Sequence, residues 1–270
     1  MSIITISRGT FSGGQALAEY LAKRLDYPCV SREVVLDAAR KSGLSAEQLT
    51  SAMEETPAFW QQVPARRMSY LNYVCSALLE RSQDGRLVYH GHAGHLLLAG
   101  ISHVIRVRVI ADLDFRTKAA MERLRLSQNE ALVHIQKIDA ERTRWTRFLY
   151  GKEWQDPSLY DVVLNLGHIS IPSAGEIVMR MTELDEFKPS AESRRALEDL
   201  LISTRVWTAL TQDERTRGAN VRVSTYQGTV TITGNAGSEK VLSAIPAVAQ
   251  RVAGVKEVRS EVGMGSDWYW

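Results

Sequence analysis

A glycine-rich loop near the start of the chain has the composition of a phosphate-binding site. Residues 7–15 read SRGTFSGGQ and stand between a β-branched stretch at 2–6 and a segment with apolar residues at helical spacing. Glycines let backbone N–H groups approach an anion, and a helix N-terminus adds partial positive charge. The loop lacks the lysine-bearing motif, because Gly14 stands at the lysine position and Ala16 at that of the hydroxyl that binds magnesium. The loop by itself is equally consistent with a tight strand–helix turn that binds nothing.

A second group of residues suited to phosphate chemistry lies at 116–150, a stretch that reads as helical. Its arginines are Arg116, Arg123, Arg125, Arg142, Arg144 and Arg147. Phosphoryl transfer requires mainly positioning and cationic stabilisation, and planar guanidinium groups supply both. The alternative interpretation is a solvated helix face with ion pairs inside the helix.

Three histidines, His90, His92 and His95, form the third chemically suggestive pattern. Alternate histidines at a strand end, with another within reach, suit a transition metal. The string partly matches the HxHxDH motif of metallo-β-lactamase-type hydrolases, but Gly94 stands where that motif has aspartate. We therefore predict no metal site and keep a metal-dependent hydrolase as the least favoured alternative. The histidines are otherwise expected at the mouth of the sheet, near the phosphate site.

The elements that must position these residues alternate between strand and helix. Apolar runs at 87–89, 104–111 and 162–166 each follow a stretch with helical character. This order predicts an α/β domain with a mostly parallel sheet covered on both faces. After a linker the pattern changes to helix, hairpin, helix and strand, which predicts a compact α+β module. The expected divisions are a first domain at 1–187, a linker at 188–193, the module at 194–264 and an aromatic tail at 265–270.

Composition excludes several classes of protein. The chain has 270 residues, with 33 Lys+Arg against 31 Asp+Glu and a net charge of +2. We therefore expect no broad nucleic-acid surface and no polybasic membrane surface. No apolar stretch is long enough for a membrane span, and we expect no export signal. Because the two cysteines lie far apart, we expect neither a disulfide framework nor a cysteine-rich zinc site, and a cytoplasmic location.

The first domain resembles the cytidylate kinase-like family, a branch of the P-loop nucleoside monophosphate kinases. Three segments carry the resemblance over about residues 1–180: the loop just described, MERLRLSQNEA followed by IQKIDAER at 121–142, and GKEWQDPSLYDVVLN at 151–165. The resemblance implies ATP as phosphoryl donor, Mg²⁺ as cofactor and a nucleoside monophosphate, CMP or dCMP by default, as acceptor. A protein ligand for Mg²⁺ is not evident, because Ala16 replaces the usual hydroxyl.

The resemblance also implies roles for individual residues. Arg8, Ser12, Gly13 and Gly14 would hold the donor phosphates. Arg116, Arg123, Arg142 and Arg147 would lie on or near a mobile lid that neutralises charge during transfer, with Asp139 orienting one of them. Ser31, Arg32 and Asp161 would contact the acceptor.

Three positions depart from the family pattern. Phe11 replaces the first glycine of the GSGG loop, Gln15 replaces an arginine, and His92 replaces the arginine of a G-R-G stretch. Two potential phosphate-binding cations are thus lost, and the loop gains a bulky side chain. These departures leave open a non-catalytic nucleotide sensor derived from a kinase.

Residues 192–264 resemble a BON domain. The features that match are VWTAL at 206–210, the hairpin VRVSTYQGTVTITG at 221–234 and VAGVKEV at 252–258. The resemblance implies binding of phospholipids, small ligands or protein partners. Without an export signal, we expect a cytosolic regulatory role in a bacterial-type protein. The sequence leaves open whether the chain forms a homo-oligomer.

Overall fold

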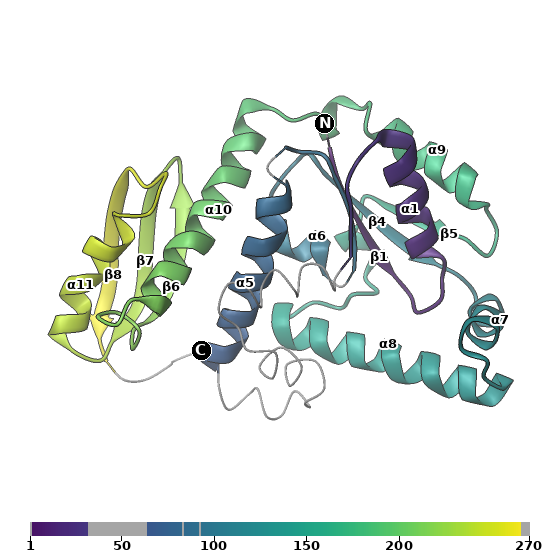
Figure 1. Ribbon diagram of the computed structural model, residues 1–270, viewed down its shortest axis with the longest axis horizontal. Coiled ribbons are helices and arrows are strands. Elements are labelled where there is room, and N and C mark those ends of the chain that lie inside the picture. Colours follow the sequence, from purple (N-terminus) through teal and green to yellow (C-terminus); the bar gives the residue numbers. More distant parts are fainter. Residues whose placement is uncertain (1, 32–63, 83, 92, 266–270) are drawn as a thin grey trace. The chain divides into compact units, whose positions relative to one another are not determined.

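The chain folds into two compact units, each with its own sheet (Figure 1). The computed structural model describes residues 2–31, 64–82, 84–91 and 93–265. Among these, the first unit contains all the residues up to Ser190 except most of α5 (Pro64–Ser82), which clusters with the second unit. The expected boundaries at 187 and 194 remain predictions.

The first unit is built on a five-stranded parallel sheet. Its strands are β1 (Ile3–Arg8), β2 (Cys29–Ser31), β3 (Leu87–His90), β4 (Val104–Ile110) and β5 (Val162–Asn165). Their order in the sheet is β2-β3-β1-β4-β5, and every pair is parallel. The β-branched composition suits strands buried on both faces. The predicted α/β class with a parallel sheet is confirmed.

The two faces of β1 have different environments. Ile4 and Ile6 point into a core that includes Leu17 of α1 (Gly14–Leu25) and Val178 of α9 (Ile171–Met181). Figure 1 shows α1 and α9 together on this face of the sheet. Side chains alternate along a strand, so Ser7 points to the opposite face, which the short helix α6 (Gly94–Leu97) covers.

Two helices that contact each other follow β4. They are α7 (Leu113–Leu124) and α8 (Gln128–Tyr150), which pack against each other (Figure 1). Asp112 caps α7 by accepting the Phe115 N–H, and Ser127 with Glu130 forms a capping box at α8. Two short 3₁₀ helices, Pro157–Leu159 and Asp185–Phe187, lie before β5 and after α9. The caps fix where each helix of the arginine-rich segment begins.

The second unit contains the predicted helix, hairpin, helix and strand. These are α10 (Ala191–Gln212), β6 (Asn220–Tyr226), β7 (Thr229–Ala236), α11 (Glu239–Ala249) and β8 (Glu257–Met264). Strand β6 pairs antiparallel with β7, which pairs parallel with β8. At the hairpin turn Gln227 and Gly228 have φ of 53° and 82°, and the Asp199 carboxylate accepts both of their N–H groups at 2.7 and 2.9 Å.

Helix α5 joins this unit through an aromatic contact. Tyr73 of α5 packs edge-on against Trp207 of α10, with ring centroids 5.8 Å apart and an interplanar angle of 87°. Both side chains are buried. Among the described residues, no helix has both the length and the apolar character needed to cross a membrane.

Candidate functional site

The glycine loop, residues 9–13, is held in place by its own backbone and by β4. The Gly9 N–H donates to the Val109 carbonyl at 3.2 Å. The Ser12 hydroxyl is fully buried and bonds to the carbonyls of Gly9 and Val109 at 2.9 and 3.2 Å. The side chain of Ser12 therefore shapes the loop, and any contact with a phosphate is left to the backbone.

The N-terminus of α1 presents backbone donors at the end of this loop. Gly13 is the N-cap residue with φ of 87° and makes no side-chain cap, and the first helical bond runs from Leu17 N to Gly13 O at 3.1 Å. The N–H groups of Gly14, Gln15 and Ala16 precede that bond and have no acceptor within the helix. Such uncapped N–H groups and the helix dipole favour an anion.

Arg8 covers the position at which a P-loop lysine would start. A Cβ added to Gly14 would lie 2.7 Å from Cβ and 2.9 Å from Cδ of Arg8. The arginine stem therefore occupies the space of a side chain at residue 14. Two features that looked separate in the sequence, a missing lysine and an arginine before the loop, form one arrangement in space.

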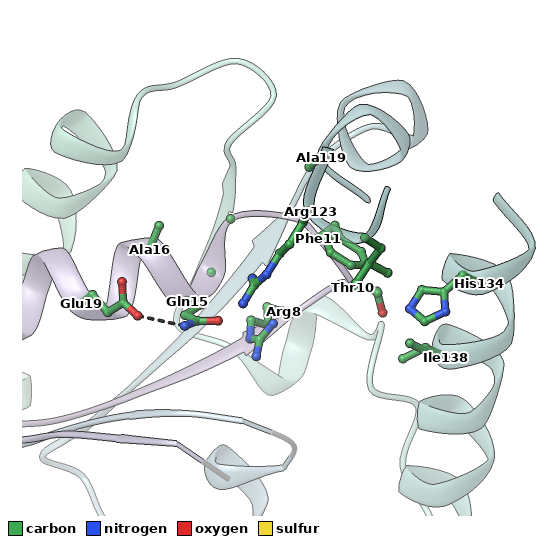
Figure 2. Close-up of a pocket in the computed structure, with 13 residues that line it drawn as sticks. Arg8, Thr10, Phe11, Gln15, Ala16, Glu19, Ala119, Arg123, His134 and Ile138 are labelled. Atoms are coloured by element: carbon green, nitrogen blue, oxygen red, sulfur yellow. Dashed lines mark hydrogen bonds between the residues drawn. The ribbon is translucent and has the colours of Figure 1, made fainter. Parts of the chain in front are cut away.

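A cavity of about 540 Å³ opens beside the loop. Its lining includes Arg8, Gly13 and Gly14 from the loop region, Arg123 from α7 and His134 from α8. Figure 2 shows the side chains of Arg8 and Arg123 extending toward one another from β1 and α7. Two guanidinium groups and a helix N-terminus make this cavity suited to a polyphosphate.

Two of the expected lid arginines instead hold the loop backbone. Arg116 donates through Nε to the Thr10 carbonyl at 2.7 Å and through Nη2 to Asp139. Arg142 donates through Nη1 to the Arg8 carbonyl and to Thr10 Oγ1, both at 2.9 Å. Asp139 Oδ1 accepts the Thr10 hydroxyl at 2.7 Å and the Thr10 N–H at 3.3 Å.

We call these four residues, Thr10, Arg116, Asp139 and Arg142, the Asp139 cluster. The ionic side chains are largely buried, at 15–23% exposure, and their charges are satisfied by one another and by loop carbonyls. Sequence reasoning did not single out Thr10, although a hydroxyl residue between Arg8 and Ser12 in a tight loop was an available signal. The cluster fixes the loop geometry before any ligand binds.

The remaining predicted arginine, Arg147, lies elsewhere. Its side chain is 66% exposed and pairs with Glu153, Nε to Oε1, at 2.6 Å near the end of α8. It does not line the cavity. The structure thus brings Arg8, Gly13, Gly14 and Arg123 to the cavity wall, and places Arg116, Asp139 and Arg142 behind the loop.

Phe11 connects the loop to α7 and α8. Its backbone has φ of 59°, a left-handed conformation that is unfavourable for a bulky residue. The side chain packs on the apolar cluster of Ala120, Ala131 and Ile135 and lies 6.0 Å from the ring of His134, between centroids. The residue that replaces a family glycine therefore anchors the helical pair to the loop.

Two of the predicted acceptor residues, Ser31 and Asp161, lie in the described part of the chain, and neither is in the loop. Ser31 ends β2, in register with His90 of β3. Arg32 lies outside the described residues. Asp161 precedes β5, where its carboxylate accepts the Arg106 N–H at 2.7 Å and pairs with the guanidinium at 3.5 Å. Arg106 is level with Thr5, three residues before the end of β1, so the structure does not bring Asp161 to the loop.

The histidine string is divided between two elements. His90 ends β3 and His95 lies in α6, both buried, while His92 lies outside the described residues. Burial, followed by the charges of Arg106 and Arg108, lowers the pKa of His95 to about 3. Within the described part of the chain, no three His, Cys, Asp or Glu side chains are arranged to hold a metal ion.

Magnesium with a nucleotide needs few protein ligands, because phosphates and water supply most of its oxygens. Ala16 has no side-chain oxygen, and those of Ser12 and Asp139 are already hydrogen bonded. Among the described residues lining the cavity, Glu19 has the one carboxylate, and it accepts the Gln15 side-chain amide at 2.9 Å. This donor set fits a magnesium ion that reaches the protein through a single carboxylate.

Comparisons with known proteins agree with the fold and the loop. The family model described as the cytidylate kinase-like family matches residues 3–168, and that of the BON domain matches residues 198–264. A protein named cytidylate kinase from Sulfolobus acidocaldarius is 25% identical over 179 residues, which cover 65% of this chain and 91% of that protein. One of the same name from Ignicoccus hospitalis is 28% identical over 184 residues, covering 67% and 99%.

One solved structure extends the fold comparison. An uncharacterized protein from Eubacterium ventriosum superposes with a TM-score of 0.54 at 21% sequence identity, covering 67% of this chain and 98% of that one. This likeness concerns the fold alone.

Proposed function

Because the chain belongs to the cytidylate kinase-like family and carries a BON domain at 198–264, we propose that its first unit is a nucleoside monophosphate kinase. The reaction transfers the γ-phosphoryl group of ATP to a monophosphate, with CMP or dCMP as the acceptor. A phosphate oxygen of the acceptor bonds to the γ-phosphorus, and the bond between that phosphorus and the bridging oxygen breaks to release ADP. The proposed location is cytoplasmic.

The observation that carries this proposal is the packing of Arg8 over Gly14 at the uncapped start of α1. A phosphate at this place would meet backbone donors and a guanidinium together. A loop without its lysine therefore retains a cation at the same position. Arg123 faces it across the cavity and would neutralise charge on the transferred group.

The Asp139 cluster supports catalysis through positioning. Arg116 and Arg142 hold the loop backbone at two points, the carbonyls of Thr10 and Arg8. Donors that are fixed before the substrate arrives stabilise developing charge without reorganisation. Magnesium, when bound with the nucleotide, would shield the phosphate charges, and Glu19 would hold it.

A non-catalytic nucleotide sensor is the second candidate. The observation that favours it is that Arg116 and Arg142 already bind the loop, so fewer cations face the cavity than the family resemblance implies. In that case the BON domain would relay nucleotide occupancy to a partner or a small ligand. If the first unit is a kinase, the BON domain would regulate its activity by binding a partner or a small ligand.

Turnover and binding measurements separate the two candidates. The full chain is mixed with ATP, Mg²⁺ and CMP, dCMP, UMP or AMP, and ADP release is followed while calorimetry records ATP binding. Arg8→Met is expected to abolish both signals. Arg24→Met, an exposed arginine on α1 paired with Glu176, serves as the matched control and should change neither.

The outcomes are distinct. ADP release that depends on a monophosphate supports the kinase. ATP binding without turnover for any monophosphate supports the sensor. Absence of nucleotide binding overturns both.

A further inference from the structure

A buried arginine lies on the face of β1 opposite the cavity. Arg108 of β4 is the register partner of Ser7 in β1, and Arg8, the next residue, packs over α1 on the other face. Arg108 is only 7% exposed. Its neighbours are Trp154 and Tyr160, whose ring centroids are 4.4 and 5.5 Å from the guanidinium carbon.

The charge of Arg108 has no acidic partner in the part of the chain that the structure describes. The nearby carboxylate of Asp161 pairs with Arg106 instead. His95, which packs against Tyr160 with ring centroids 4.6 Å apart and an interplanar angle of 40°, adds no negative charge. Buried charges in proteins are normally paired, because contact with aromatic rings and one carbonyl does not replace lost hydration.

The hydrogen bonds of Arg108 are also incomplete. Nη1 donates to the Trp154 carbonyl at 2.8 Å, and this is the one hydrogen bond of the guanidinium among the described residues. Nε and Nη2 have no hydrogen-bond partner among the described residues, but neither atom is fully shielded from solvent. Each of these donors therefore keeps some exposed surface.

Hydrogen bonds position the residues around Arg108. The Tyr160 hydroxyl donates to the Trp154 carbonyl at 2.7 Å and is hydrogen bonded to the Ser7 hydroxyl at 3.1 Å. Trp154 Nε1 donates to Thr143 of α8 at 2.9 Å. The aromatic side chains and the carbonyl thus hold the guanidinium plane in one orientation, which suits a planar, two-point contact with an oxyanion.

We propose that Arg108 binds a phosphate group, in a second anion site on the opposite face of β1 from the Arg8 cavity. The assignment of this phosphate to the acceptor nucleotide rests on the kinase function proposed above. Ser7 is level with Arg108, and Arg8 is the next residue of β1. The donor phosphate beside Arg8 and the acceptor phosphate beside Arg108 would then lie on either side of the end of this strand. The same chemistry would also bind free inorganic phosphate.

The test removes the charge of Arg108 and keeps the length of its side chain. Arg108→Met and Arg108→Lys are compared with Arg106→Met, a control from the same strand face whose carboxylate partner is known. Calorimetry gives CMP and ATP affinity, initial rates give KM, and thermal unfolding gives stability. Inorganic phosphate is titrated in an Arg8→Met background, so that the first anion site does not contribute.

We expect Arg108→Met to weaken CMP binding at least 10-fold, with unchanged ATP affinity and an equal or higher melting temperature. Arg108→Lys should restore part of the CMP affinity. Arg106→Met should bind CMP normally and melt at a lower temperature, because Asp161 loses its ion pair with the Arg106 guanidinium. A phosphate-dependent rise in melting temperature should appear in the Arg8→Met protein and vanish when Arg108 is also replaced.

Failure of this proposal is distinguishable from failure of the kinase proposal. If CMP is phosphorylated with the same KM in Arg108→Met, the Arg108 site is overturned and the kinase stands. If no monophosphate is phosphorylated but phosphate protection depends on Arg108, the site stands and the kinase is overturned. A strong loss of stability in Arg108→Met would show that the arginine has a structural role, and it would overturn the proposed site.

Discussion

Arg8 fills the space in which a side chain on Gly14 would have to lie, since a Cβ there would come within 2.7 Å of the Arg8 Cβ. The two residues therefore depend on each other. Glycine is needed so that the arginine can pack against the start of α1, and the arginine places a positive charge in the cavity wall beside that helix N-terminus.

Replacing Gly14 by alanine tests this dependence. We expect Gly14→Ala to destabilise the protein by about 1–3 kcal/mol, the usual effect of overpacking, and to weaken ATP binding by displacing Arg8. Urea unfolding and calorimetry measure the two effects. Gly9→Ala is the matched control, because its Cβ would lie 3.5 Å from Arg116, an ordinary contact. Equal stability of both variants with the wild type would contradict the packing argument.

Replacing Asp139 tests whether the Asp139 cluster holds the loop. Asp139→Asn removes the charge shared by Arg116 and Arg142, and we expect a loss of about 1–3 kcal/mol for these partly buried pairs. Turnover should fall by roughly 100-fold, because a small displacement of the loop misplaces the phosphates. Chemical denaturation and steady-state rates give both values.

Arg147→Ala is the control for Asp139→Asn. Its exposed pair with Glu153 is expected to contribute no more than about 1 kcal/mol, and turnover should not change. A large loss of turnover in Arg147→Ala would assign it the lid role that the family resemblance implies.

Replacing Phe11 separates backbone strain from packing. Phe11→Gly relieves a left-handed conformation that costs about 1–2 kcal/mol but loses a partly buried ring of similar value, so net stability should change little. Hydrogen exchange in α7 and α8 should nevertheless become faster, because the contact with Ala120 and Ile135 is lost. Phe11→Leu keeps an apolar side chain and should retain the slow exchange. Unchanged exchange in Phe11→Gly would show that the ring does not anchor the helices.

The buried ring of His95 predicts a dependence of stability on pH. Its pKa falls from 6.5 to about 3 on folding, so between these values the unfolded chain binds a proton that the folded chain does not. Stability therefore falls as the pH is lowered from 6.5 toward 3, by up to about 1.4 kcal/mol per pH unit. Urea unfolding of wild type and His95→Phe at pH 7, 6, 5 and 4 isolates this slope. Parallel curves for the two proteins would refute it.

Much of the fold followed from local patterns. Short apolar runs that alternate with stretches of helical spacing predicted the parallel sheet, and the strand, glycine loop and helix from Ile3 to Leu25 formed as expected. The second unit was equally readable, because the turn residues Gln227 and Gly228 separate two alternating strands. These features depend on neighbours in sequence, so they are visible without a structure.

The arginines show what could not be predicted from the sequence. The pattern identified a set of cations, but it did not distinguish Arg116 and Arg142, which bind loop carbonyls, from Arg123, which lines the cavity. It also passed over Arg108, although two arginines at alternate positions in the apolar run 104–111 were a visible signal. Which way each guanidinium points depends on contacts with residues as much as 134 positions away.

The sequence by itself determined the helices and strands, their alternation, and the presence of a loop whose composition suits phosphate binding. Only the tertiary structure decided that the Arg8 side chain packs against Gly14, that Asp139 holds Thr10, and that Arg108 is buried with no acidic partner among the described residues. The physical reason is that backbone preferences act between near neighbours, whereas the pairing of charges is decided by strand register and by which helix covers each face of the sheet.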